Sequence, residues 1–107
     1  MPQTDEEILA ELRQPIDELT NKYGSNLDEM NRYRLRQLPW QAVDILVNTE
    51  AVAHLKNNEN LKRLIRDVRQ IGASDKFIDE AVALAVEIYQ KMKTDYPALY
   101  NRYKYKR

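Results

Sequence analysis

The chain has 107 residues, of which 43% are apolar and 32% are charged, a balance that suits one folded domain and excludes wholesale disorder. It has only two glycines and four prolines, too few for an all-β chain with many tight turns. Its 17 basic and 17 acidic residues give zero formal net charge, which argues against a globally basic nucleic-acid binder.

The first predicted helix begins after Thr4. Thr4 and Glu7 fit a capping box, in which two side chains satisfy free backbone N–H groups at a helix start. Apolar residues then follow along one helix face: Ile8, Leu12, Ile16, Leu19 and Tyr23. Pro15 interrupts this segment, so the helix either bends there or a second helix starts. Because the apolar stripe stays in phase across Pro15, we expect a bent helix that Gly24 ends.

Two helices are predicted in residues 26–47. Asn26 and Glu29 resemble a weak helix start. Pro39 disfavours helical geometry at Leu38, so we expect a new helix to begin at Pro39. The predicted inward faces are Leu27, Met30 and Leu38 in the first helix, and Trp40, Val43, Leu46 and Val47 in the second.

The segment after residue 47 contains a turn and the most regular helix. Residues 48–55 either continue the preceding helix or restart it at Asn48 or Thr49, and residues 56–60 are typical of a turn. A helix is then predicted over 61–71, with its apolar face formed by Leu61, Leu64, Ile65, Val68 and Ile71.

Clear signals separate the remaining helices. Gly72 is a helix stop, and Ser74 caps a helix over about 75–94. Pro97 begins a short final helix with Tyr96, Leu99, Tyr100 and Tyr103 on its inner face. The sequence therefore predicts an all-α fold: a compact antiparallel bundle of four to six helices with short loops. Residues 1–107 form one domain, whose last ten or so residues are a short docked helix plus a basic tail.

Charge is unevenly distributed along the chain. The net charge is −6 over residues 1–31, +4 over 32–71, −2 over 72–95 and +4 over 96–107. The candidate binding cations of the first positive block are Arg32, Arg34, Arg36, Lys62, Arg63, Arg66 and Arg69. They form either one positive surface for an anionic partner, or a solvated face paired with the acidic N-terminal helix.

The C-terminal stretch combines aromatic and basic residues. Its candidate binding residues are Tyr100, Arg102, Tyr103, Lys104, Tyr105, Lys106 and Arg107. Two interpretations stay open, and both can hold together. In the first, the tyrosines dock a final helix, and its cations are stabilised near the helix C-terminus by the helix dipole. In the second, the stretch is an aromatic and cationic surface that binds a partner. Tyr105 and the last basic residues fall outside the tyrosine stripe and are expected to stay free.

Several kinds of chemistry are excluded by residue type. The chain has no cysteine and one histidine, His54, so disulfides, thiol chemistry and a nitrogen–sulfur zinc site are excluded. No phosphate-binding glycine loop or catalytic motif is present, and we expect no catalytic residue, metal or cofactor. The acidic N-terminus lacks a signal peptide, and no apolar run reaches the ~18–20 residues of a membrane span. The sequence is thus typical of a cytoplasmic protein.

The leading functional hypothesis is a small non-enzymatic protein that binds another macromolecule, with a protein as the favoured partner. It would act as an adaptor, inhibitor or regulatory factor. This layout is similar to that of the small bacteriocin immunity proteins, cytosolic four-helix bundles with a functional C-terminal segment. The similarity is one of layout and transfers no residue.

Three alternatives remain beside it. A nucleic-acid-binding regulator would use the basic blocks 32–36, 62–69 and 102–107. Residues 64–85 loosely resemble a helix-turn-helix, but acids at the start of the second helix favour an ordinary helical hairpin. An enzyme would need a pocket around His54. Trp40 and the tyrosines are core residues or the seam of a homodimer.

Overall fold

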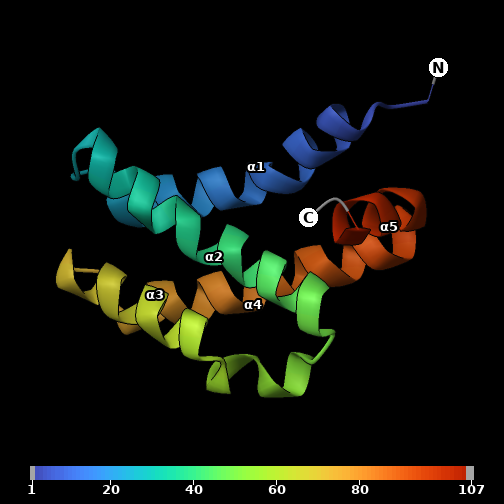
Figure 1. Cartoon of the computed structure of the whole chain (residues 1–107). Coiled ribbons are helices and arrows are strands. Elements are labelled where there is room, and N and C mark those ends of the chain that lie inside the picture. The colour runs from blue at the N-terminus through green and yellow to red at the C-terminus, as the bar shows by residue number, and fades with distance from the viewer. Residues whose placement is uncertain (1, 106–107) are drawn as a thin grey trace.

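Six helical segments and no strand make up residues 2–105, the part of the chain that the computed structural model describes. They are α1 (Asp5–Gly24), α2 (Glu29–Thr49), the 3₁₀ helix η1 (Val52–Asn57), α3 (Glu59–Gln70), α4 (Asp75–Asp95) and α5 (Pro97–Tyr105). Figure 1 shows α1 to α4 running back and forth, with α5 folded back beside the end of α4. The predicted all-α antiparallel bundle of four to six helices is therefore confirmed.

Helix α1 runs through Pro15 as one element. The predicted capping box is present: the Glu7 N–H donates to Thr4 Oγ1 over 3.2 Å, and the Thr4 N–H donates to the Glu7 carboxylate over 3.4 Å. Pro15 is exposed, while its neighbour Ile16 is 1% exposed in the core. The alternative of a second helix starting at Pro15 is not observed, because the buried stripe continues across the proline.

Gly24 has a different role from the predicted helix stop. It is the last residue of α1 and does not have a positive φ, whereas Gly72 after α3 does, at 95°. A Cβ atom on Gly24 would lie 2.9 Å from Leu35 Cδ1 and 3.3 Å from Arg32 Cγ. Gly24 therefore permits the close approach of α1 and α2, while Gly72 is the predicted stop.

Helix α2 begins later than predicted and does not break at Pro39. Asp28, rather than Asn26, is the N-cap, and its carboxylate accepts the Asn31 N–H over 2.8 Å. The expected new helix at Pro39 is wrong, because α2 continues to Thr49. Residues on both sides of Pro39 lie in the core, and their burial offsets the ~3 kcal/mol that an internal proline costs.

Helix α2 is the central element of the bundle. Its buried residues are Leu35, Leu38, Pro39, Ala42, Val43, Leu46 and Val47. It contacts α1, η1, α3, α4 and α5, so that the core is assembled around it. Met30, predicted to face inward, is instead 67% exposed at the start of α2, beyond the end of this buried stripe.

A left-handed residue separates α2 from the 3₁₀ helix. Glu50 has φ 53° and ψ 25°, and its N–H donates to the Leu46 carbonyl over 2.8 Å. This geometry ends α2, so the predicted continuation of the helix is wrong. A helix does restart, but as η1 at Val52 with Ala51 as N-cap rather than at Asn48 or Thr49. The turn predicted over 56–60 is reduced to Asn58, which caps α3 by accepting the Leu61 N–H.

The last two helices agree with the sequence-based expectation. Ser74 caps α4 by accepting the Phe77 N–H over 3.1 Å, and α4 packs its alanine-containing face against α2 and α1. Helix α5 buries Leu99 and Tyr100 against the bundle. Within residues 2–105, no helix has both the length and the apolar character to cross a membrane.

Candidate functional site

The cations of α3 form a row on one face of the helix. Lys62, Arg66 and Arg69 are spaced i, i+4 and i+7, so their side chains leave the same side of α3, and all three are exposed. The row borders a groove of about 390 Å³ between α3 and α4. The groove is lined by Lys56, Lys62, Ile65, Arg66, Arg69, Ile78, Asp79 and Val82.

The ion pairs that the groove cations form within the chain do not neutralise the positive charge of the groove. Lys62 lies 3.5 Å from Glu59 and Arg69 lies 3.1 Å from Asp75, but these side chains are between 45% and 84% exposed. Such exposed pairs contribute only about 0–1 kcal/mol, so a partner can replace them at little cost. Arg66 makes no ion pair or hydrogen bond within the described residues. Its charge is therefore available to a partner.

Arg63 lies on the same helix but outside the groove lining. Its guanidinium donates to Asn60 Oδ1 over 3.4 Å, on the exposed side of α3. The four predicted cations of 62–69 therefore divide into three that border the groove and one that does not.

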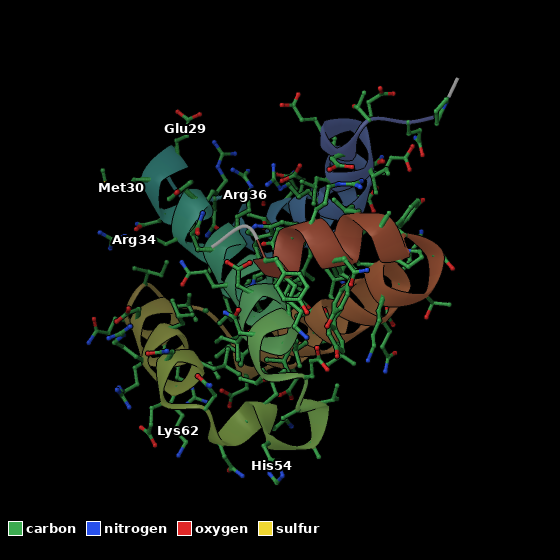
Figure 2. The ribbon with its side chains drawn as sticks, turned by 45° about the vertical axis from the view of Figure 1, so that its right-hand side comes forward. Glu29, Met30, Arg34, Arg36, His54 and Lys62 are labelled. Atoms are coloured by element: carbon green, nitrogen blue, oxygen red, sulfur yellow. The ribbon has the colours of Figure 1, made fainter. Side chains whose placement is uncertain are left out.

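The arginines of block 32–36 do not act together. Arg36 Nε lies 2.9 Å from Asp17 Oδ1 on α1, which agrees with the predicted pairing with the acidic N-terminal helix. Arg32 is half-buried beside Gly24. Arg34 projects outward from the first turns of α2, close to Met30, as Figure 2 shows. Of these three arginines, Arg34 is the exposed one.

Arg34 borders a second cleft, between α2 and α3, of about 430 Å³. Its lining is mostly polar and includes one acid: Arg34, Gln37, Gln41, Leu64, Asp67, Val68, Gln70 and Ile71. Because Asp67 offsets Arg34, this cleft has no excess of positive charge, in contrast to the groove between α3 and α4.

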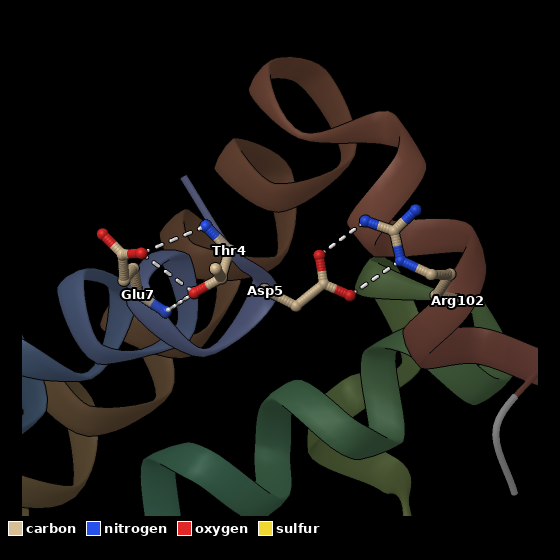
Figure 3. A network of polar contacts seen from close by, with 4 residues as sticks. All are labelled: Thr4, Asp5, Glu7 and Arg102. Carbon is tan, nitrogen blue, oxygen red and sulfur yellow. Dashed lines mark hydrogen bonds and ion pairs between the residues drawn. The ribbon is translucent and has the colours of Figure 1, made fainter. Parts of the chain in front are cut away.

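Two cations of the C-terminal stretch, Arg102 and Lys104, pair with acids of other elements of the bundle. Arg102 donates to Asp5 over 2.7 Å from Nε and 2.5 Å from its terminal nitrogen, next to the capping box of α1 (Figure 3). The Asp5 carboxylate raises the pKa of Arg102. Lys104 pairs with Glu50. The hydrogen bond from Lys104 is the larger cause, and that from Tyr100 the smaller, that lowers the pKa of the Glu50 carboxyl.

The tyrosines of α5 complete its docking. The Tyr100 hydroxyl donates to Glu50 over 3.2 Å, and burial is the main cause that raises the pKa of Tyr100. Tyr103 donates to Asp44 and its ring packs edge-on against Trp40, with the ring centroids 6.2 Å apart. The docked helix predicted for this stretch is therefore observed.

Within the described part of the C-terminal stretch, Tyr105 is the candidate residue that extends furthest into solvent. Tyr105 is 78% exposed, as expected from its position outside the tyrosine stripe. Lys106 and Arg107 lie outside the described residues. Arg34 and Glu50, the C-cap of α2 and partner of Lys104, are 16 residues apart, or about 24 Å along the helix axis. Arg36, in contrast, lines a cleft with Trp40, which packs on Tyr103, so the two tyrosine–arginine stretches approach each other at Trp40 but not at Arg34.

Comparison with known proteins adds no homologue to this geometry. No family model, curated protein or solved structure matches the chain. The similarity of layout to the bacteriocin immunity proteins gains nothing from these comparisons. The chemistry of the surface is therefore the basis for a functional inference.

His54 is exposed on η1, as Figure 2 shows, beside a cleft of about 240 Å³. The other residues of this cleft are Ile45, Thr49, Ala51, Leu55, Asn57 and Asn58. None of these is a carboxylate that could orient the imidazole, and the Thr49 hydroxyl donates to the Ile45 carbonyl. Among residues 2–105, no three His, Asp or Glu side chains are grouped as a metal site would require.

The groove between α3 and α4 is the arrangement best suited to binding. Ile65, Ile78 and Val82 supply apolar surface inside it, and cations border it. The sequence predicted the cations but missed the groove, because its apolar residues come from two helices and were assigned only to the core. Such a mixed surface matches an elongated partner with both apolar and acidic groups.

Proposed function

We propose that this chain is a small non-enzymatic helical protein that binds another protein through the groove between α3 and α4. The observation that carries the proposal is the exposed Arg66, which makes no ion pair with any residue of 2–105 and borders apolar surface. Arginine beside apolar residues is typical of protein interfaces, where its stem packs and its guanidinium pairs with carboxylates. An adaptor, inhibitor or regulatory factor would use such a surface.

The cytoplasm is part of the same proposal. The chain has no cysteine and so no disulfide, whereas disulfides are common in small proteins of oxidising compartments. The isolated position of His54 supports a non-enzymatic role, because no acid or base in its cleft would tune it for proton transfer.

Affinity capture from the native host tests the proposal. The wild-type chain and the Lys62→Glu/Arg66→Glu variant are immobilised in parallel, and the extract is treated with nuclease so that nucleic acid cannot bridge proteins. We expect a protein retained by the wild type, lost in the variant, and bound directly when purified. Equal retention by both chains, or no purified protein that binds directly, would refute the role of this groove.

Nucleic-acid binding is the second candidate, favoured by five cations within residues 56–69: Lys56, Lys62, Arg63, Arg66 and Arg69. If it is correct, affinity for DNA or RNA falls steeply between about 50 and 200 mM salt. It also predicts that charge reversal at Arg34, Arg63, Arg66 and Arg102 abolishes binding. The apolar part of the groove lining, which a phosphate backbone would leave unused, makes it the weaker candidate.

A further inference from the structure

The groove between α3 and α4 has the shape and chemistry of one edge of a helix-binding site. Its cationic border is linear: from Lys62 through Arg66 to Arg69 it covers seven residue steps of α3, or about 10 Å. This is the length of two helical turns, so a second helix lying alongside α3 would face all three cations with residues spaced in the same way.

The floor of the groove is apolar and belongs to both helices. Ile78 and Val82 of α4 are one turn apart and are only 5% and 7% exposed, and Ile65 of α3 is half-buried opposite them. Apolar side chains entering the groove would contact these three residues without uncovering the core. A ligand with charge alone would leave this apolar surface unused.

We infer that the occupant of this groove is an acidic amphipathic helix of a partner protein, an inference that rests on the proposed protein-binding function. Its apolar residues, at i, i+3 or i+4 and i+7, pack on Ile65, Ile78 and Val82. Its carboxylates, on the adjoining edge, pair with Lys62, Arg66 and Arg69. The occupant thus lies along the bundle as an added helix.

Charge distribution favours this occupant over the alternatives. A phosphate backbone has no apolar stripe that could pack on the floor of the groove. The acidic α1 of the same chain is not available, because its apolar face is buried against α2 and α4. An acidic helix from outside is therefore the occupant that satisfies both the cations and the floor.

A defined probe tests the inference. The probe is an end-capped peptide of about 15 residues, long enough to form a helix, with leucines at helical spacing and glutamates elsewhere. A matched peptide carries glutamine in place of each glutamate. Fluorescence anisotropy measures affinity, and methyl NMR locates the site. We expect the glutamate peptide to bind about tenfold more tightly than the glutamine peptide and to shift the methyl signals of Ile65, Ile78 and Val82.

Arg63 provides a matched control on the same helix. Arg66→Glu and Arg63→Glu make the same change of charge at neighbouring exposed positions, but only Arg66 borders the groove. We expect Arg66→Glu to lower the affinity for the glutamate peptide about tenfold, and Arg63→Glu to change that affinity by no more than about twofold. A peptide with lysine in place of glutamate should bind Arg66→Glu better than the wild type. Circular dichroism confirms that both variants are folded.

Five results would overturn the inference. Equal weakening by Arg63→Glu and Arg66→Glu would show long-range attraction without a defined site. Methyl shifts elsewhere would place the peptide on another surface, and tighter binding of a short DNA duplex than of the peptide would assign the row to nucleic acid. If the captured partner binds the Lys62→Glu/Arg66→Glu variant as tightly as it binds the wild type, the protein-binding function stands and the groove assignment fails. If the measured mass of the chain rises with its concentration in the absence of peptide, and Arg66→Glu abolishes this rise, the occupant is a second copy of the chain.

Discussion

Replacing Pro15 with alanine is expected to raise the free energy of unfolding, and to raise it by more than the same replacement at Pro39. The two prolines are a matched pair, because each is the eleventh residue of a long helix that runs through it. They differ in burial. Pro15 is exposed, whereas Pro39 is among the side chains with less than 2% exposure.

The two magnitudes follow from that difference. Alanine is about 3 kcal/mol more favourable than proline inside a helix, because it restores an N–H that donates to the carbonyl four residues earlier. At residue 15 no buried surface is lost, so the full gain of about 3 kcal/mol is expected. At residue 39 two buried methylene groups are removed, worth about 0.8 kcal/mol each, which reduces the gain to about 1.4 kcal/mol.

Urea denaturation followed by circular dichroism measures both gains, with the slope of the transition serving as the control for a changed unfolded state. The expected order is Pro15→Ala above Pro39→Ala, and both above the wild type. An equal gain at both sites would show that burial of Pro39 contributes nothing. No gain at residue 15 would refute the description of α1 as one helix with a local cost at its proline.

Three further changes test the packing of the bundle. Leu99→Ala should lower the free energy of unfolding by about 2–5 kcal/mol, whereas Tyr105→Ala should change it by less than about 0.5 kcal/mol, because only Leu99 is buried. Gly24→Ala should destabilise the chain in chemical denaturation despite the helix propensity of alanine, since its Cβ would lie 2.9 Å from Leu35 Cδ1; Leu35→Val in the same chain should recover part of the loss. The lowered pKa of Glu50 contributes stability that is present above its unfolded pKa and is lost as pH falls through the folded value. Thermal melts should therefore show the wild type losing more stability than Glu50→Gln between about pH 5 and pH 3, and parallel losses would contradict the assignment.

The features that the sequence predicted correctly depend on neighbouring residues. Thr4 and Ser74 cap their helices through backbone groups three residues away, and Gly72 needs only its own φ to end α3. A spacing pattern contains all the information for such local contacts. The short final helix was also predictable, because its tyrosines repeat at helical spacing.

The errors occur where distant residues decide the outcome. Pro39 would end an isolated helix, but the core on both sides keeps α2 continuous. Gly24 is of the residue type that commonly ends a helix, yet its role is to let Leu35 of α2 pack closely against α1. Arg102 and Asp5 are 97 residues apart in sequence, so no local pattern could predict that this cation is already paired.

The candidate site was half predictable for the same reason. The row Lys62, Arg66 and Arg69 follows directly from helical periodicity. The apolar floor could not be predicted, because only the tertiary structure places Ile78 and Val82 of α4 in the same groove as Ile65 of α3. Cations on a solvated face and cations beside apolar surface look alike in the sequence.

The central position of α2 has a consequence for the dynamics of the chain. Every other helical segment of residues 2–105 rests on α2, so none can detach without uncovering part of it, and α2 can be released only when the others have gone. Native-state hydrogen exchange should therefore find the slowest amides around Leu38 to Leu46, exchanging through global opening. The short η1 and α3 should open earlier, which would let the wall of the groove adjust to an incoming helix while the rest of the bundle stays closed.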